Sequence, residues 1–387
     1  MRKFVEYFLI KWVLQLKSYQ IQVSLNIKIG CNLLIEKSWL IYALGGGWGH
    51  LNRALSLGRI AAKNRTVTII CNSPYLEYLL SAQTEKYDIL PKIEGCYIEF
   101  ISPRDNLNIT RDRIQKILSD RQYQCLIIDT FPRGLGGELV DILPKITAKK
   151  ILVHRDIKPD YIRAKQLQNF VENYFDLILI PGEIGKLPFS HLPQVKYTSP
   201  WLIRCDNELP KLLESYLLLN IKSEEMTLSQ SAKIVIISSS GKAEELKYYG
   251  KLTQILAEKF TNIIFRCLAA ECPENCPREL WLFHWPGIEC LLAADLVIAG
   301  AGYNTMYECL ALGIPLLAMP FKRMYDRQEL RIEKCQKLGK VEKIENIETV
   351  INGIEKYLKL NYQQKPVIKF INGAIEAVKL IEKTLES

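Results

Sequence analysis

Short apolar runs alternate with segments of helical periodicity through most of the chain after Ser38. In the first half, the runs typical of buried strands occupy residues 39–44, 67–71, 125–128, 151–154 and 177–180, and the apolar spacing of residues 51–62 is typical of a helix. Strands that alternate with helices in this way predict a parallel sheet with helices on both faces. The first half is therefore expected to be an α/β domain.

A second series of the same kind follows. It begins with the apolar run and serines of residues 233–241, continues with a helix that ends near residue 259 and a strand over 262–267, and includes a buried strand over 296–299. The second half is therefore expected to be another α/β domain.

The segment 206–231 between the two series is polar and has no strand pattern, which favours an interdomain linker. We therefore expect Rossmann-like domains at 38–205 and 232–387.

Residues 1–37 do not fit the start of either domain. Their apolar residues recur at helical spacing among six Lys or Arg and two Glu residues, and Lys11 interrupts any stretch long enough to span a bilayer. The broken apolar run also fits a secretory signal poorly. Two interpretations stay open: an amino-terminal extension without a fixed structure, or a basic amphipathic helix that binds weakly to an anionic membrane.

The composition fits a globular protein of two ordinary domains. The 387 residues are 48% hydrophobic and 24% charged, which argues against extensive disorder. The net charge of +9 favours anionic partners, such as a small anionic ligand or an anionic membrane face, but the chain has no Lys/Arg block of the nucleic-acid-binding type. The 11 cysteines are irregularly spaced and several lie in apolar runs, which indicates a reducing, cytoplasmic location.

One group of residues raises the question of a metal site. Cys272 and Cys276 lie close together, with His284 further on, which invites a zinc interpretation. Their spacing lacks the paired Cys-x-x-Cys ligands of structural zinc sites. We therefore expect no metal.

The segment 294–339 carries the clearest binding chemistry. A buried strand ends at Gly300-Ala301-Gly302, where the backbone can turn tightly and approach a ligand, and a helix then starts near Asn304. The unpaired N–H groups at the start of that helix suit a phosphate or diphosphate. Glu308, one turn further on, is placed to accept hydrogen bonds from a ribose diol.

The order of residues in this segment resembles a known family. The residues are Gly302, Asn304, Thr305, Glu308, Gly313-Ile314-Pro315, Pro320-Phe321 and Asp326-Arg327-Gln328. They resemble the donor-binding half of GT-B glycosyltransferases, especially the MurG-type N-acetylglucosaminyltransferases of glycosyltransferase family 28. The resemblance implies two Rossmann-like domains facing each other across a cleft, a UDP-sugar in the second domain, and sugar contacts from Asp326 and Gln328.

The resemblance has a limit at the sugar. The family pattern continues with Asn four residues beyond the Gln, and this chain has Ile332 there. N-acetylglucosamine is therefore not implied.

Two further loops of the second domain have counterparts in the family. Ser240 and Gly241 end the first strand of this domain, where the family's loop lies beside the donor diphosphate, although a serine-capped turn explains them equally well. Trp285 lies at the position of the family's nucleobase loop. It either faces a uracil ring or packs in the core.

The loop Gly45-Gly46-Gly47-Trp48-Gly49-His50 follows the first strand and faces the expected cleft. Its spacing is not the Gly-x-Gly-x-x-Gly of dinucleotide-binding proteins. It resembles the family's Gly-Gly-x-Gly-Gly-His, with Trp48 where the pattern has glycine, which predicts an acceptor-side loop. His50 is the candidate general base, or alternatively a residue that only shapes the loop.

Asp129 ends the strand 125–128 and is expected at the same sheet edge. It orients His50, serves as the base itself, or caps the next turn. Arg133 and Glu138 in the same loop, with Arg155-Asp156 after the next strand, form either an acceptor pocket or a salt-bridged rim.

Together these features predict a hexosyltransferase-type glycosyltransferase that moves a sugar from a UDP-sugar to an unidentified acceptor. A lipid-linked acceptor at a membrane face is one of the acceptors that this prediction allows. Helix ends and backbone amides stabilise the departing diphosphate in this scheme, so no metal or other cofactor is expected beyond the co-substrate. The alternatives are a UDP-sugar hydrolase or epimerase on the same fold, and a non-catalytic nucleotide-sugar-binding protein.

Overall fold

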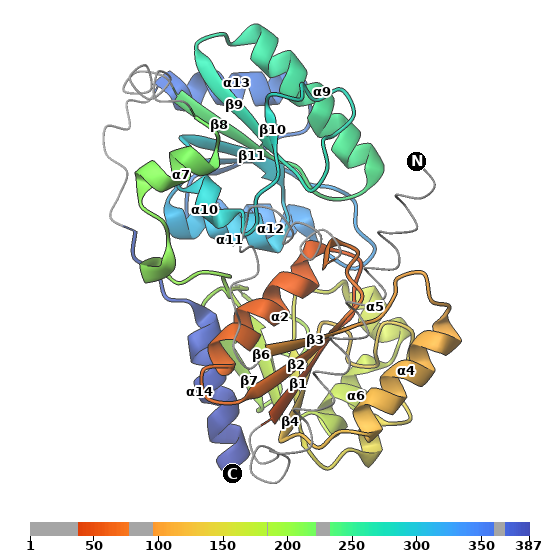
Figure 1. Cartoon of the computed structure of the whole chain (residues 1–387). Helices are drawn as coiled ribbons and strands as arrows, with labels where there is room; N and C mark the ends of the chain where they lie inside the picture. The colour runs from red at the N-terminus through yellow and green to blue at the C-terminus, as the bar shows by residue number, and fades with distance from the viewer. Residues whose placement is uncertain (1–37, 77–95, 184, 222–232, 360–367) are drawn as a thin grey trace, which may run out of the picture.

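The computed structural model describes residues 38–76, 96–183, 185–221, 233–359 and 368–387. Two α/β domains lie one above the other (Figure 1). The expectations for residues 1–37 fall outside the described residues.

The first domain is built on a seven-stranded sheet in the order β3-β2-β1-β4-β5-β6-β7, with every pair parallel. Its strands are β1 (Ser38–Ala43), β2 (Thr66–Cys71), β3 (Cys96–Phe100), β4 (Cys125–Asp129), β5 (Lys149–Val153), β6 (Leu177–Pro181) and β7 (Val195–Thr198). The predicted strands of this half are thus present, and β3 and β7 are additional.

Helices cover both faces of this sheet. On one face lies α2 (Trp48–Ala61); on the other lie α4 (Leu107–Ser119), α5 (Pro159–Ala164) and α6 (Leu167–Tyr174). Successive residues of β1 alternate between the two hydrophobic clusters, as expected for a strand buried on both faces.

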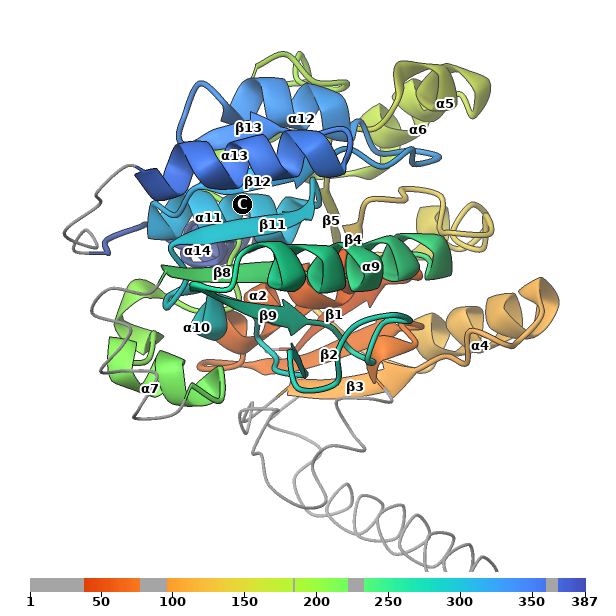
Figure 2. The same ribbon diagram turned by 90° about the horizontal axis from the view of Figure 1, so that it is seen from above.

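The second domain has a six-stranded parallel sheet in the order β10-β9-β8-β11-β12-β13. Its strands are β8 (Lys233–Ser238), β9 (Ile263–Leu268), β10 (Trp281–Leu282), β11 (Leu296–Gly300), β12 (Leu316–Met319) and β13 (Val341–Lys343). Its helices are α9 (Ala243–Lys259), α10 (Ile288–Leu291), α11 (Tyr303–Leu312), α12 (Gln328–Cys335) and α13 (Ile347–Lys359), and α9, α12 and α13 flank the sheet when seen from above (Figure 2).

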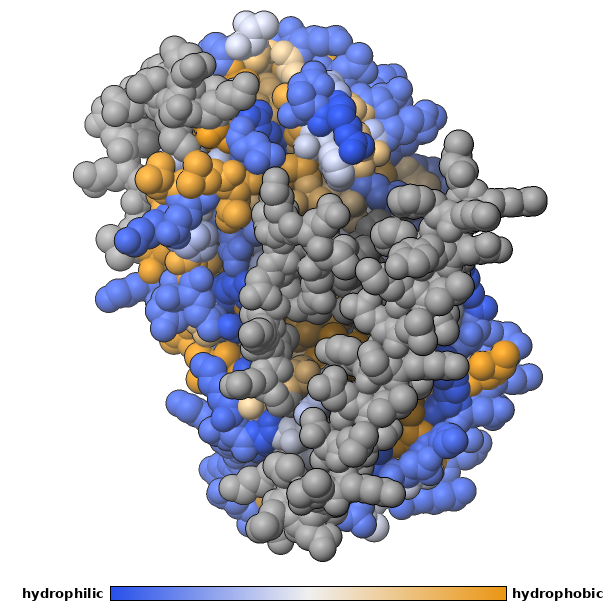
Figure 3. All heavy atoms as spheres, in the orientation of Figure 1, coloured by the Kyte–Doolittle hydropathy of each residue, from blue (hydrophilic) through white to orange (hydrophobic). Residues whose placement is uncertain are grey.

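The predicted linker contains more structure than expected. Residues 206–221 form a short 3-10 turn (Asp206–Glu208) and α7 (Leu212–Leu218), which packs against α10 of the second domain. Apolar side chains gather on the surface over α7 (Figure 3), where Leu213 and Leu217 are exposed. The segment is therefore neither uniformly polar nor a simple tether.

The last helix corrects the predicted domain 232–387. α14 (Gly373–Glu386) packs against α2, β6 and β7 of the first domain. Its Glu376 accepts a hydrogen bond from the Ser199 amide at 2.6 Å, and Glu382 pairs with Arg65. The sequence pattern alone could not show this return, because an amphipathic helix fits either sheet.

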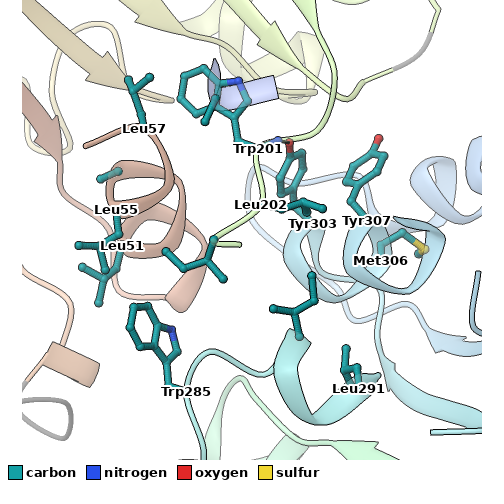
Figure 4. Packing of buried hydrophobic residues seen from close by; sticks show 14 of the residues in the cluster. Leu51, Leu55, Leu57, Trp201, Leu202, Trp285, Leu291, Tyr303, Met306 and Tyr307 are labelled. Carbon is teal, nitrogen blue, oxygen red and sulfur yellow. Dashed lines mark hydrogen bonds between the residues drawn. The ribbon is translucent and has the colours of Figure 1, made fainter. Parts of the chain in front are cut away.

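One hydrophobic cluster runs from the first domain into the second. Leu51 and Leu55 of α2 lie near Trp285, while Trp201 and Leu202 lie near the start of α11 (Figure 4). The two domains therefore share one apolar core beside the cleft.

Candidate functional site

A cleft of about 500 Å³ lies between the two domains. Its walls come from segments that follow the carboxyl ends of β1 and β5 in the first domain and of β8, β9 and β11 in the second. Ligands of open parallel sheets bind at this edge. Most of the predicted site residues meet here: Gly46, Gly47, Trp48, Gly49, His50, Ser240, Gly241, Trp285, Gly302, Asn304, Thr305, Glu308, Asp326 and Gln328.

His50 and Asp129 form a pair at the first-domain wall. The His50 Nδ1 atom lies 2.5 Å from Asp129 Oδ2. Arg53 holds the same carboxylate in a two-pronged contact, with Nε donating to Oδ1 at 2.9 Å and Nη2 to Oδ2 at 2.8 Å. His50 and Arg53 are three residues apart on α2, so one helical face presents both to Asp129.

The local backbone explains how the ring fits. A side chain at Gly45 would place its first carbon 2.1 Å from His50 Cδ2 and 2.5 Å from Nε2. Gly45 is therefore required for the imidazole to lie across the loop. Its amide donates to Asn72 Oδ1 at 2.7 Å, which fixes the loop against the end of β2.

The electrostatics favour a neutral His50 beside an ionised Asp129. Burial lowers the pKa of His50 below its usual value, although Asp129 opposes this shift. Burial alone would raise the pKa of Asp129, but the charge of Arg53 and the hydrogen bonds from Arg53 and His50 hold it well below its usual range. Nδ1 then donates to Asp129 and the lone pair lies on Nε2, as a general base requires. The orienting interpretation of Asp129 fits this geometry, since its oxygens are occupied.

The remaining first-domain residues divide into two groups. Trp48 lines the cleft and stacks on Tyr75 with ring centres 4.5 Å apart, so the residue that departs from the family pattern adds an aromatic wall. Arg133 does not reach the cleft. It packs over Phe170, 4.9 Å from the ring centre, and donates to the Gln166 carbonyl.

The loop around Arg133 is held by Glu138. This buried carboxylate accepts hydrogen bonds from the Tyr42 hydroxyl and the Gly136 amide. The position of Arg133 therefore gives no support to its predicted acceptor-side role, because the residue is not part of the cleft lining.

At the second-domain wall, α11 begins directly after Gly302. Asn304, Thr305 and Glu308 of this helix all line the cleft, so its N-terminal N–H groups and positive dipole end face the same space as His50. Gly300 lies beneath this surface, where an added Cβ would meet the Tyr249 hydroxyl at 3.2 Å. Burial raises the pKa of Glu308 to about 7.

The turn after β8 is the second glycine element of this wall. Gly241 has a φ of +130°, a backbone conformation that residues other than glycine rarely adopt. An added Cβ would also lie 2.0 Å from Glu245 Oε2. Glu245 in turn pairs with Arg323, whose Nη2 donates to it at 2.6 Å, so both flanks of the turn are fixed.

Trp285 is buried against the first domain. Its Nε1 donates to Asn52 Oδ1 at 2.9 Å, and it belongs to the apolar cluster shared by the domains. Packing therefore accounts for most of the ring, while one edge borders the cleft. His284 beside it contacts Glu289 at 2.8 Å, so it does not join Cys272 and Cys276.

Asp326 and Gln328 line the cleft and also hold their own loop. Asp326 accepts from Arg331 Nη1 at 3.0 Å, and Gln328 Oε1 accepts from the Phe321 amide at 2.8 Å. An antiparallel bridge joins Asp326 to Ile157 of the first domain. The Asp-Arg-Gln loop therefore touches both domains.

Two other kinds of site are absent from the described residues. No group of three or more His, Cys, Asp or Glu residues in this part of the chain is arranged to hold a metal ion. None of its helices is long and apolar enough to cross a bilayer.

The structure adds residues that the sequence pattern missed. Arg53 holds Asp129, and its guanidinium lies 5.6 Å from the ring centre of Tyr303 at the start of α11. Its spacing from His50 on a predicted helix was the available signal. Tyr303 gave no signal, because an aromatic residue at a helix start usually packs in the core.

Comparison with known proteins identifies one family domain in the chain. Residues 287–384 match the glycosyltransferase family 28 C-terminal domain. No curated protein matches the chain.

Among solved structures, the chain is similar to the glycotransferase of kitacinnamycin, with a TM-score of 0.56 and 13% identity over 90% of this chain and 99% of that one. It is similar to MurG of Acinetobacter baumannii, with a TM-score of 0.52 and 13% identity over 90% and 99%. It is also similar to the UDP-GlcNAc 2-epimerase of Neisseria meningitidis bound to UDP-GlcNAc, with a TM-score of 0.56 and 14% identity over 90% and 99%.

The architecture is therefore that of GT-B proteins, as the sequence predicted. Within that architecture, residues 287–384 match the glycosyltransferase family 28 C-terminal domain, and the fold of the chain is similar to that of MurG.

Proposed function

We propose that this protein is a hexosyltransferase that moves a sugar from a UDP-sugar to an acceptor hydroxyl. The observation that carries the proposal is the placement of the His50–Asp129 pair opposite the N-terminus of α11 in one cleft. A base and a diphosphate site on facing walls are what direct sugar transfer needs.

The chemical step uses groups on both walls. The acceptor oxygen attacks the anomeric carbon while His50 Nε2 takes its proton, and the bond from that carbon to the diphosphate breaks with its electron pair passing to the leaving oxygen. The positive end of α11 and the amides near Gly302 and Gly241 favour the charge that develops there. Glu308 binds the ribose diol. The scheme uses no cofactor beyond the UDP-sugar.

The structure also bears on the acceptor. Trp48 and Tyr75 present a stacked aromatic surface near His50, which suits the apolar face of a sugar ring or a planar acceptor. The proposal includes a lipid-linked acceptor, which would place the protein peripherally at the cytoplasmic membrane face.

The similarity to a UDP-GlcNAc 2-epimerase supports a second candidate, a UDP-sugar epimerase or hydrolase. Product analysis separates the functions. Purified protein is incubated with a panel of UDP-sugars, with and without candidate acceptors, and the sugars are resolved by chromatography. Acceptor-dependent release of UDP together with a glycosylated product supports the transferase. Free sugar without acceptor indicates a hydrolase, an isomerised sugar an epimerase, and UDP binding without turnover a binding protein.

A further inference from the structure

Arg155 occupies a special position between the two walls. It follows β5 and lines the cleft from the first domain. Its guanidinium carbon lies 4.8 Å from the ring centre of Tyr303, the first residue of α11. A cation of the first domain is therefore held at the N-terminus of the helix to which the proposed function assigns the diphosphate.

The contacts of Arg155 with carboxylates are loose. Nε lies 3.9 Å from Glu183 Oε1, and Nη2 lies 3.5 Å from Asp326 Oδ1. Both nitrogens are buried, and neither makes a hydrogen bond to any residue in the described ranges. Arg155 also lines the cleft, so its guanidinium carries unsatisfied donors beside the proposed diphosphate site.

These carboxylates do not depend on Arg155. Arg331 binds Asp326 at 3.0 Å and lies 3.6 Å from Glu183, closer than Arg155 in both cases. Buried charged donors without hydrogen bonds are costly to a fold. A purely structural role therefore explains Arg155 poorly.

The surroundings favour the arrival of an anion. Burial lowers the pKa of Arg155, and the nearby charges of Arg53 and Arg331 lower it further. A guanidinium whose charge is disfavoured in this way gains more from an incoming phosphate than an exposed one.

We propose that Arg155 is a catalytic residue that binds the β-phosphate of the nucleotide donor from the first domain, opposite the α11 amides. The inference rests on the proposed function. In the transfer step, the C1–O bond breaks, its electron pair passes to the β-phosphate oxygen, and Arg155 stabilises the resulting charge. The diphosphate is then bridged by both domains.

The test compares the affinities of UDP and UMP by titration calorimetry, because UMP lacks the β-phosphate. Arg155→Gln removes the positive charge, whereas Arg155→Lys keeps the charge on a shorter side chain. Arg65→Gln is the matched control, since Arg65 also stacks on an aromatic ring, 4.1 Å from the Trp39 ring centre, and pairs with a carboxylate far from the cleft.

We expect Arg155→Gln to weaken UDP binding about tenfold to a hundredfold while UMP binding changes less than about twofold. Arg155→Lys should recover part of the loss, and Arg65→Gln should keep the wild-type ratio of the two affinities. UMP affinity reports the integrity of the site in each variant. An unchanged UDP-to-UMP ratio in Arg155→Gln overturns the inference while the proposed function stands. If wild-type protein binds neither nucleotide, the UDP assignment itself fails and this inference fails with it.

Discussion

The two walls of the cleft are built in different ways. The first-domain wall consists of side chains that hydrogen-bond to one another: the Asp129 carboxylate contacts both Arg53 and His50. The second-domain wall uses the backbone at two strand-to-helix turns, with Glu308 as the one carboxylate of α11 that lines the cleft. The contrast predicts that the chemical step and donor binding can be separated by mutation. Changes in the His50–Asp129–Arg53 group should alter turnover, changes in the second wall should alter nucleotide affinity, and Arg155 is the first-domain residue expected to affect affinity.

The largest effect is expected from His50→Ala. Loss of a general base typically lowers turnover about a hundredfold to ten-thousandfold, whereas UDP affinity should change little because the residue lies on the opposite wall. Steady-state kinetics and UDP titration measure the two quantities. His191→Ala, which alters an exposed histidine of the same domain, is the control. Near-normal turnover in His50→Ala would move the base role to another group.

The pH profile of the wild-type enzyme sharpens the same assignment. A base must be neutral to act, so activity should rise with pH through the pKa of His50. Because burial lowers that pKa, the acid limb should fall below pH 6.5, the usual value for histidine. A limb centred well above that value would indicate that a different group titrates.

The next largest effect is expected from a substitution in the second-domain wall. Glu308→Ala should weaken UDP binding by about 1.5 to 3 kcal/mol, the range for a hydrogen bond to a charged group. Turnover at saturating donor should fall much less than in His50→Ala. Glu329→Ala removes the same charge from an exposed site of the second domain and should leave the affinity unchanged. Equal UDP affinity in wild type and Glu308→Ala would remove the ribose role.

A smaller effect is expected on the free energy of unfolding, because the carboxyl group of Glu308 is buried. Its folded-state pKa is raised to about 7, so the native state retains a proton that the unfolded chain releases from about pH 4.5 upward. The contribution of this residue to stability therefore declines as pH rises from 4.5 to 7. Glu308→Gln should stabilise the ligand-free protein by roughly 1 to 3 kcal/mol at pH 8 and much less at pH 5. Urea unfolding at both pH values measures this, and a pH-independent difference would contradict it.

The same contrast explains what the sequence could predict. The second wall is local: a strand, glycines and a helix follow one another within a few residues, and Gly302, Thr305 and Glu308 all reach the cleft as expected. The first wall depends on a contact between His50 and Asp129, which are 79 residues apart. Sheet order predicts that both lie at one edge, but the sequence left the role of Asp129 open, and the contacts of its carboxylate with His50 and Arg53 favour the orienting role.

The features that the sequence did not reveal have equally physical causes. Arg133 follows the same strand as Asp129, yet its guanidinium packs over Phe170 and donates to the Gln166 carbonyl. α14 is an ordinary amphipathic helix whose partner sheet is set by a long return of the chain. β10, with two residues, is too short to leave a pattern. Such features depend on tertiary contacts that periodicity does not encode.

The smallest effect tests the joint between the walls. Asn52 lines the first wall and accepts a hydrogen bond from the buried Trp285 of the second. Asn52→Ala and Trp285→Phe should each destabilise the protein, and a double-mutant cycle should give a coupling of about 1 kcal/mol in urea unfolding, since one buried hydrogen bond joins them. Trp285→Phe also removes ring volume, so only the coupling isolates the bond. Additive losses would show that this hydrogen bond adds nothing to stability beyond the shared apolar core and the other contacts between the domains, such as the Ile157–Asp326 bridge.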